Sequence, residues 1–287
     1  MFDLTDAIDM HVHTGPDLFP RIGDDAAIAR GCHTAGMSGM AVKCHFEGTA
    51  VRAHLVNQMV PGFTMYGGIT LNYPVGGINP MAVQACLAVG GKVVWFPSGH
   101  AHYHADVTGT LGGWGNSFMR LENPKGAEGL TVAGENGELT EDAREVIRLV
   151  AEADALIATS HLSPEEILLV LDEARTVGAR TLVNHVMYMP QCDLDFIEEV
   201  VRRGAAVEVC SVLVGGFWDR LRLDDVVAIL ERVGARNLVI ASDGGGIQTP
   251  SPHESLRVLL DNLLHHGVAE EDLRCAITET PRRLLGV

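Results

Sequence analysis

The sequence is poor in basic side chains, and this shortage limits the partners that its surface can bind. Lys and Arg together number 21 against 37 Asp and Glu, which gives a formal net charge of -16 over 287 residues. Nucleic acids and anionic membranes both attract basic surfaces. We therefore expect no nucleic-acid partner and no membrane partner, and we predict a small-molecule substrate instead.

Paired cysteine spacings are also missing. No C-x-x-C occurs among the six cysteines, which excludes a zinc ribbon and gives no support to a disulfide framework. We interpret them as reduced, mostly buried thiols. They are Cys32, Cys44, Cys86, Cys192, Cys210 and Cys275.

Long apolar runs are the third absence. A membrane-spanning helix needs about 20 apolar residues, and the sequence has no run close to that length. The first residues also lack a basic segment followed by an apolar one, which a secretory signal requires. These observations favour a cytoplasmic protein.

What the sequence does contain is an alternation of short Val-, Ile- and Leu-rich runs with longer amphipathic stretches. This alternation is typical of βα units around a parallel sheet, and eight such units fit a (β/α)8 TIM barrel. No repeat or linker divides the chain, so we predict one domain over residues 1–287. The expected strands are 7–13, 39–45, 63–71, 92–97, 156–161, 181–185, 206–212 and 238–243, and the clearest helices are 24–35, 49–59, 164–177 and 194–203.

One connection is much longer than the others. Residues 98–139 lie between the fourth and fifth strands, whereas most βα loops have about 2–6 residues. The segment contains glycines, aromatic residues, the histidines of "GHAHYH" and a turn signal at Asn136-Gly137. We predict an ordered lid. Loop histidines are common, so contact of His100, His102 or His104 with a metal or substrate is one alternative and a solvated loop strand is the other.

Four apolar strands end in histidine or aspartate. The first carries His11 and His13 in "DMHVHT", the fifth ends at His161 and the sixth at His185, and the eighth ends at Asp243. Residues two apart on a strand face the same side, and the carboxyl ends of barrel strands carry the active site. Imidazole and carboxylate groups suit zinc or a neighbouring divalent ion. The pattern therefore predicts a metal site at the barrel mouth.

These strand-end residues make the sequence resemble the amidohydrolase superfamily of metal-dependent barrel enzymes. The resemblance runs over nearly the whole chain and includes the terminal "TETPRRLLGV". It implies that His11, His13 and Asp243 hold one ion, and that His161 and His185 hold a second ion or orient water. The implied cofactor is Zn²⁺, with Mn²⁺, Ni²⁺ or Fe²⁺ as alternatives, at one or two ions per chain.

The sequence departs from this family at the fourth strand. Family members with two ions commonly bridge them with a carboxylated lysine or a glutamate near the end of that strand, but Lys92 lies at its beginning. Lys43 and His45, two apart on one face at the mouth end of the second strand, offer a substitute, because a lysine inside a barrel needs a partner or a modification. Lys43 is interpreted as a carboxylated bridge or as an ammonium that binds a substrate carboxylate, against the alternative of an exposed lysine.

Other residues complete the predicted site. Glu208 lies within an apolar strand and needs a partner, which is either a metal-ligating histidine, Lys43 or an ion pair at the base of the barrel. We assign catalysis to Asp243, His185 and Lys43, and substrate binding to Lys43 and a set of histidines. These histidines are His45, His100 and His102.

The predicted function is hydrolysis of an amide-type C–N bond, open or cyclic, in a small polar molecule. Lactone hydrolysis and metal-dependent decarboxylation on the same scaffold are alternatives, because the ligands do not identify the bond. The start "DMHVHT" also resembles the polymerase and histidinol phosphatase family of phosphoesterases, although that family tends to end in D-x-H and this chain has Asp243-Gly244-Gly245. A binding barrel without turnover is the last alternative. The leucine-rich stretch 254–266 packs into the core or at an interface, and we expect a homo-oligomer.

Overall fold

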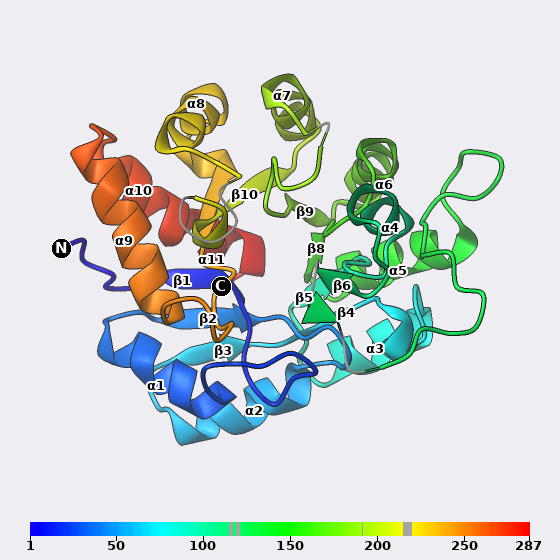
Figure 1. Cartoon of the computed structure of the whole chain (residues 1–287), viewed down its shortest axis with the longest axis horizontal. Helices are drawn as coiled ribbons and strands as arrows, with labels where there is room; N and C mark the ends of the chain where they lie inside the picture. The colour runs from blue at the N-terminus through cyan, green and yellow to red at the C-terminus, as the bar shows by residue number, and fades with distance from the viewer. Residues whose placement is uncertain (115–116, 119–120, 191, 215–219) are drawn as a thin grey trace.

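The computed structural model describes residues 1–114, 117–118, 121–190, 192–214 and 220–287. Within them, parallel strands form a closed barrel with helices around it, so the predicted TIM-barrel fold is confirmed (Figure 1). The barrel strands are β1 (Ile8–Val12), β2 (Gly39–Val42), β3 (Thr64–Tyr66), β4 (Gly68–Thr70), β5 (Val93–Trp95), β8 (Leu156–Ala158), β9 (Arg180–Val183), β10 (Ala206–Cys210) and β11 (Leu238–Ala241).

The third expected strand is divided in two. β3 pairs with β2 and β4 pairs with β5, so this stretch connects the two sheets of the barrel. Gly67 lies between them, and a Cβ there would be 2.5 Å from the Cα of Ala50. Glycine therefore lets the strand pass close to the start of the preceding helix, at the point where the strand changes partner.

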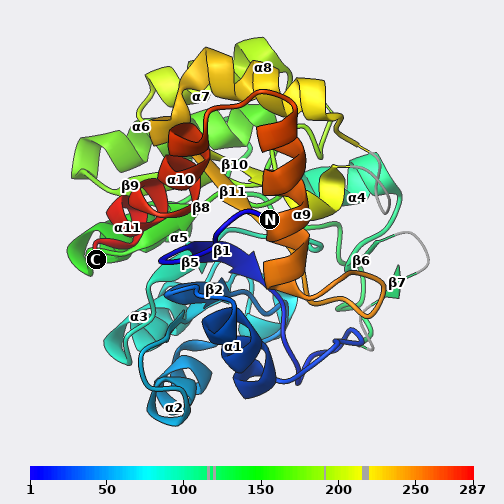
Figure 2. The same cartoon turned by 90° about the vertical axis from the view of Figure 1, so that its left-hand side faces the viewer.

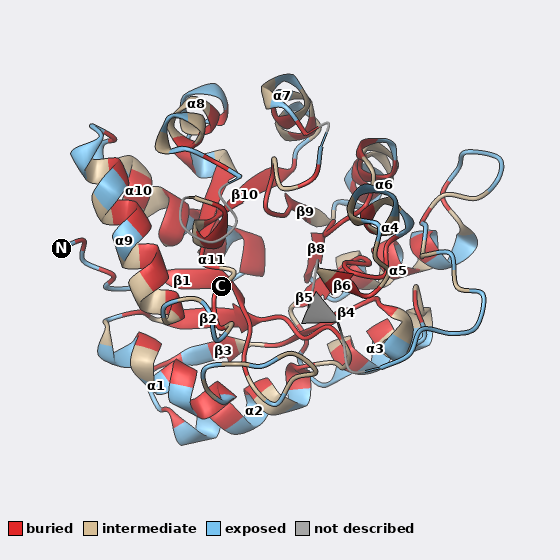
Figure 3. Cartoon of the chain, viewed as in Figure 1, coloured by how far each residue is buried: buried red, intermediate tan, exposed pale blue. Residues whose placement is uncertain are grey.

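The barrel closes between its first and last strands. The amide of Asp243 donates to the carbonyl of His11 at 2.9 Å, and the amide of His13 donates to Gly244 at 2.8 Å. The described strands are buried almost throughout, as Figure 3 shows. Such strands are covered on both faces, which explains their continuous apolar runs.

The helices of the outer layer follow the predicted order. Their apolar faces cover the strands and their polar faces meet solvent. The helices are α1 (Asp25–Thr34), α2 (Ala50–Met59), α3 (Pro80–Ala88), α5 (Glu141–Glu152), α6 (Pro164–Val177), α7 (Leu194–Arg202), α8 (Leu223–Val233), α9 (Pro252–His265), α10 (Glu270–Ile277) and α11 (Glu279–Leu285). No helix in the described residues combines the length and apolar character that a membrane crossing requires.

The packing of α11 and α9 shows where the terminal segment and the leucine-rich stretch lie. α11 packs against β1, β9 and β11 and so covers the amino-terminal end of the barrel. α9 buries its leucines in the core but leaves Val258 56% exposed. The leucine-rich stretch therefore belongs mainly to the core of the molecule, and the homo-oligomer stays a prediction.

The long connection is ordered over its described residues. It contains α4 (His102–Thr108), β6 (Gly113–Trp114), β7 (Ser117–Phe118) and an antiparallel bridge between Ala133 and Leu139 around the predicted Asn136-Gly137 turn. Residues 115, 116, 119 and 120 of the predicted lid lie outside the described residues. α4, β6 and β7 lie on the same side of the barrel as the loop into α9 (Figure 2). We call residues 98–139 the covering segment.

Candidate metal centre

His161, His185 and Asp243 lie in the turns that follow their strands, not at the strand ends as the sequence predicts, whereas His11 lies within β1. β8 ends at Ala158, β9 at Val183 and β11 at Ala241, two or three residues earlier than expected. The physical reason is the backbone, because Ser160, His185 and Asp243 adopt positive φ values of 51°, 30° and 50°. Such conformations cost energy and concentrate at functional sites. Here they bend the chain over the barrel mouth.

The histidines form a continuous row across this end of the barrel. Neighbouring ring centroids lie 4.8 to 5.7 Å apart along the row. In order, the row runs His45, His13, His11, His185, His161 and His104. Each of these residues is at most 5% exposed. Burial lowers the pKa of His13 to about 4 and that of His185 to about 3, so these rings are neutral at neutral pH, which is the form that can bind a metal.

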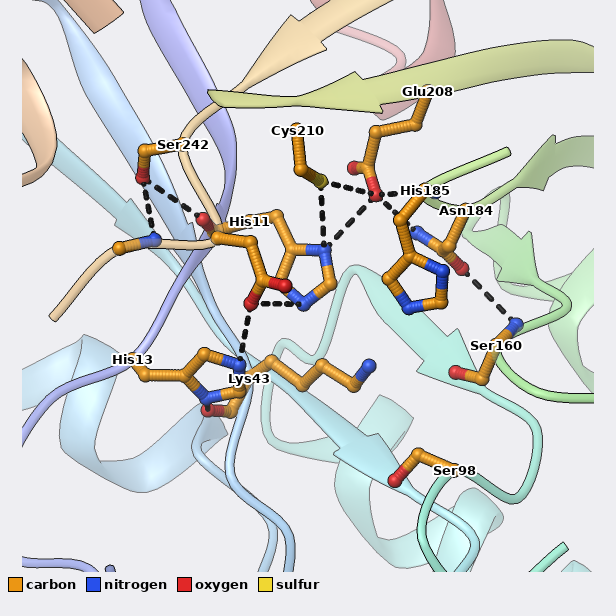
Figure 4. A network of polar contacts seen from close by, with 12 residues as sticks. His11, His13, Lys43, Ser98, Ser160, Asn184, His185, Glu208, Cys210 and Ser242 are labelled. Atoms are coloured by element: carbon orange, nitrogen blue, oxygen red, sulfur yellow. Dashed lines mark hydrogen bonds and ion pairs between the residues drawn. The ribbon is translucent and has the colours of Figure 1, made fainter. Parts of the chain in front are cut away.

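Asp243 is the carboxylate at which two of these rings converge. Its Oδ1 lies 3.0 Å from Nε2 of His13 and 3.4 Å from Nε2 of His11 (Figure 4). Burial acts to raise the pKa of Asp243, but the adjoining His11 and His13 outweigh it and hold the pKa far below its usual range. The carboxylate is therefore ionised and faces two imidazole nitrogens.

An oxygen acceptor contacts the Nδ1 atom of each of these two histidines. Nδ1 of His11 lies 2.9 Å from Oε2 of Glu208, and Nδ1 of His13 lies 2.8 Å from the carbonyl oxygen of Lys43. A hydrogen-bond acceptor at one ring nitrogen keeps the proton there and leaves the other nitrogen free to bind a metal. The Nε2 atoms are thus prepared as ligands.

Unpaired buried atoms support the fit to a cation. Nε2 of His11 and Oε1 of Glu208 are fully buried, and neither has a hydrogen-bond partner among the described residues. Buried polar atoms are seldom left unpaired in folded proteins. A divalent ion bound by His11, His13 and Asp243 satisfies the first of these atoms.

Cys210 is a residue that the sequence analysis did not select. With His11 and Asp243 it forms a group whose ligand atoms lie within 4.8 Å of one another. Its Sγ faces Oε2 of Glu208 at 3.4 Å, on the Nδ1 side of His11. Burial and the adjoining Glu208 raise the pKa of this thiol well above its usual value, which disfavours the thiolate that a metal needs. The signal in the sequence was its position two residues after Glu208 on one strand.

Glu208 is the organising carboxylate of this region. Its Oε2 accepts from the side-chain amide of Asn184 at 3.0 Å and from the backbone amide of His185 at 3.2 Å, in addition to His11. Burial acts to raise its pKa, but His11 and these bonds lower the pKa of Glu208 to about 2. The structure therefore joins Glu208 to the imidazole row and not to an ion pair at the barrel base.

Lys43 directly follows β2 and is 2% exposed, which excludes the alternative of an exposed lysine. Its side chain extends into the centre of the site, as Figure 4 shows. Burial lowers the pKa of the Lys43 ammonium, although Asp243 and Glu208 oppose this effect. The Lys43 amine can therefore contact a molecule or ion that binds beside the central histidines of the row.

The other histidines selected from the sequence lie in different surroundings. His45 joins the row and bonds Ser98 at 3.1 Å. His100 contacts Tyr73 and Asn123 instead, and His102 is exposed and pairs with Asp106. The structure thus places His100 and His102 apart from the row, and their selection as substrate-binding residues stays a prediction. His104 is the histidine of "GHAHYH" that reaches the site, and its place on α4 could not be read from a loop sequence.

Aromatic residues cover the row, and the sequence analysis did not select them. The indole of Trp114 lies 4.8 Å from His45, 5.3 Å from His104 and 5.3 Å from Phe19, measured between ring centroids. Tyr188 lies against His161 and His185, and the indole of Trp114 also bonds the Tyr188 hydroxyl. A cavity of about 440 Å³ opens beside Phe19, between Gly15 and Asp24. The covering segment therefore forms part of the site.

Known proteins give the chain a family and a fold. Residues 6–208 match the model of a family of unknown function (DUF6282). The chain belongs to this family. No curated protein matches the sequence of this DUF6282 chain.

Solved structures resemble it over nearly its full length. A probable dipeptidase from Pseudomonas aeruginosa has a TM-score of 0.65 at 12% identity and covers 98% of this chain and 94% of its own. A putative 2-pyrone-4,6-dicarboxylic acid hydrolase from Pseudomonas putida has a TM-score of 0.62 at 15% identity, with 99% and 98% covered. An amidohydrolase from Burkholderia multivorans with bound zinc has a TM-score of 0.59 at 12% identity, with 98% and 99% covered. The chain thus has the barrel fold of the amidohydrolases.

Proposed function

We propose that this chain is a metal-dependent hydrolase that cleaves an amide-type C–N bond, open or cyclic, of a small polar molecule. The observation that carries the proposal is the convergence of two histidine Nε2 atoms on Asp243, each ring being held at Nδ1 by a separate acceptor. This arrangement matches the outer-shell support that metal-ligating histidines have. The amidohydrolase fold of the chain gives further support.

The ligands follow from the geometry. Nε2 of His11 and His13 and the carboxylate of Asp243 would hold one divalent ion, and the facing Nε2 atoms of His161 and His185, 3.2 Å apart, would hold a second ion or a water molecule. When bound, such an ion supplies the means to ionise a water molecule near neutral pH and to polarise a carbonyl group. We favour Zn²⁺, because imidazole and carboxylate ligands suit it.

The chain's own residues would move the proton. Asp243 is ionised and lies at the centre of the site, so it accepts the proton of the attacking water and passes it to the leaving nitrogen. Lys43 places an amine where the substrate lies, either as a carboxylated ligand or as an ammonium that binds a carboxylate. Trp114 and Tyr188 exclude bulk water, and His185 orients the reacting groups from the far side.

A lactone is the second candidate substrate. Attack of water on the carbonyl carbon is the same for an amide and an ester, and the solved structures with this fold include a 2-pyrone-4,6-dicarboxylic acid hydrolase by name. The phosphoesterase alternative is disfavoured by Gly245. A Cβ at this position would lie 1.8 Å from the carbonyl oxygen of His13, so a D-x-H histidine does not fit there.

The test combines metal content with a substrate panel. Protein purified without chelator is analysed for metal per chain and then assayed on amides, cyclic amides, lactones and an aryl phosphate, with Zn²⁺, Mn²⁺, Ni²⁺ or Fe²⁺ added. We expect one or two ions per chain, turnover of an amide or a lactone, and loss of both ion and turnover in Asp243→Asn. Full activity in that variant, or no bound ion after reconstitution, overturns the proposal. Ion binding without any turnover identifies a binding protein instead.

A further inference from the structure

A chain of hydrogen bonds runs from the covering segment into the site. The carbonyl oxygen of Gly113 lies 2.7 Å from Nε2 of His104, and Nδ1 of His104 lies 2.7 Å from Nδ1 of His161. Nε2 of His161 then lies 3.2 Å from Nε2 of His185. Each ring nitrogen of His104 and His161 makes one of these contacts. The positions of the protons can therefore be worked out in order from the Gly113 end.

The proton positions follow from the chemistry at the outer end. A carbonyl oxygen only accepts hydrogen bonds, so Nε2 of His104 carries a proton. A neutral imidazole has one N–H group, which leaves Nδ1 of His104 as an acceptor. The proton between the two Nδ1 atoms therefore belongs to His161. Nε2 of His161 is then a bare lone pair that faces His185.

This reasoning requires neutral rings, and the surroundings provide them. His104 is fully buried and His161 is 3% exposed. Burial makes a charged imidazolium costly, and the described hydrogen-bond contacts of the two rings are to a backbone carbonyl and to other imidazoles, not to a carboxylate. A second proton on His104 is thus disfavoured.

Packing holds the two rings in this geometry. Their centroids are 4.8 Å apart with the planes 26° from parallel, and the indole of Trp114 packs edge-on against both. Both Trp114 and Gly113 belong to β6, so one short strand supplies the carbonyl acceptor and the covering ring. The covering segment thereby acts on the site through His104.

We propose that His104 is a positioning residue, which holds His161 in the tautomer whose Nε2 lone pair faces the centre of the site. A His161 ring without this acceptor is free to carry its proton on Nε2 instead. The use of the lone pair, to bind an ion or a water proton, rests on the proposed function. The tautomer itself does not.

Nitrogen NMR of the metal-free protein tests the tautomer directly. Long-range ¹H–¹⁵N correlation spectra of protein labelled in histidine distinguish a protonated ring nitrogen from a bare one, and a His161→Asn variant assigns the signals of His161. We expect Nδ1 of His161 to be protonated and Nε2 to be bare. The opposite pattern in the unmodified protein overturns the inference, and this measurement needs no variant of His104 to fold.

Variants at position 104 test the cause. His104→Leu removes the acceptor and should move the His161 proton partly or wholly to Nε2. His104→Asn places an amide oxygen where Nδ1 was and should restore the original pattern. Asp106→Asn, on the exposed side of the same helix, is the matched control and should leave it unchanged. An unchanged His161 pattern in His104→Leu contradicts the proposal.

Metal titration separates this inference from the proposed function. His104→Leu should weaken ion binding at His161 by ~10–100-fold, as loss of an outer-shell partner does, and leave the ion at Asp243 unchanged. If the chain binds no ion at all, the proposed function fails while the NMR result still decides the tautomer. If ions and turnover are normal but His161 is protonated on Nε2, only the inference about His104 fails.

Discussion

Two parts of the imidazole row, His11 with His13 and His161 with His104, are supported by different parts of the molecule, and we call them its first and second halves. His11 and His13 are fixed by groups on the barrel strands, namely Glu208 on β10 and the carbonyl of Lys43 after β2. His161 is fixed by His104 and Gly113, which belong to the covering segment. The first half is therefore as rigid as the barrel, whereas the second half depends on how the covering segment is seated.

This difference assigns separate tasks to the two halves. Strands buried on both faces hold the Nε2 atoms that converge on Asp243, so an ion there needs no contribution from the covering segment. The His161 half is complete only when α4 and β6 are in place over it. Loss of the segment should therefore reduce the second half of the site and spare the first, and the following experiments test this comparison from the largest expected effect to the smallest.

Removal of one ligand from each half gives the largest contrast. His13→Ala should abolish the ion at Asp243, with a loss of affinity beyond the ~100-fold that an outer-shell change costs, and should abolish turnover with it. His161→Ala should leave one ion per chain, because His11, His13 and Asp243 are unchanged. Metal analysis after dialysis against a weak chelator measures both. Equal ion loss in the two variants would show that the halves are not independent.

A smaller effect is expected when the support of His11 is weakened. Glu208→Gln keeps the shape but removes the charge that holds Nδ1 of His11, and we expect a ~10–100-fold lower ion affinity at Asp243. Cys210→Ser is the matched control on the same strand, and it should retain the ion because the protonated thiol is not a ligand. Competition with a chromophoric chelator gives the affinities. A loss of the ion in Cys210→Ser contradicts the ligand set of two histidines and one aspartate.

The acid stability of the metal-free protein tests whether His100, near the start of the covering segment, is buried in the folded state. Burial lowers the pKa of His100 to about 4 from an ordinary value of 6.5, so the folded state binds fewer protons than the unfolded state between these values. The free energy of unfolding is then highest above pH ~6.5 and falls as the pH drops towards 4, by ~1.4 kcal/mol per unit for each such histidine. His100→Asn should make this fall shallower by that amount. Urea unfolding from pH 4 to 7.5 measures it, and parallel curves refute the assignment.

Much of this organisation could be predicted from the sequence. Alternating apolar runs located the barrel strands, and the predicted helix 164–177 has the same bounds as α6 (Pro164–Val177). The proximity of His11, His13, His185 and Asp243 could be predicted because the carboxyl ends of parallel strands meet at one edge. These signals are either local in the sequence or follow from the regular geometry of the (β/α)8 barrel.

The rest depends on contacts between distant segments. His104 bonds His161 across 57 positions, and Glu208 bonds His11 across 197. The sequence identified Glu208 as a buried charge in need of a partner, but it could not choose among the partners. For His104 it could not distinguish a buried ring from the exposed His102 two residues earlier. Covering segments carry no periodic pattern, so their contacts are fixed only by the folded barrel.

The smallest expected effect concerns Glu166 on α6, which accepts hydrogen bonds from residues near the end of the covering segment. Oε1 of Glu166 on α6 accepts from the Thr131 hydroxyl at 2.5 Å and from the Val132 amide at 2.8 Å, and Oε2 accepts from the amide of Ser163. Glu166→Gln keeps one accepting oxygen, so we expect a loss of only ~1 kcal/mol in the free energy of unfolding.

The informative readout for Glu166→Gln is local. Amide hydrogen exchange should quicken at Val132 and on α4, while β1 and β11 keep their protection. Ser163→Ala removes the other half of the capping box and costs a similar ~1 kcal/mol, but it leaves both bonds to the segment in place, so it is the matched control. Faster exchange on α4 in Glu166→Gln alone indicates that the covering segment opens as a unit hinged on the barrel. Equal exchange in both variants indicates that α4 is held by the row of histidines itself, and that the second half of the site is no more mobile than the first.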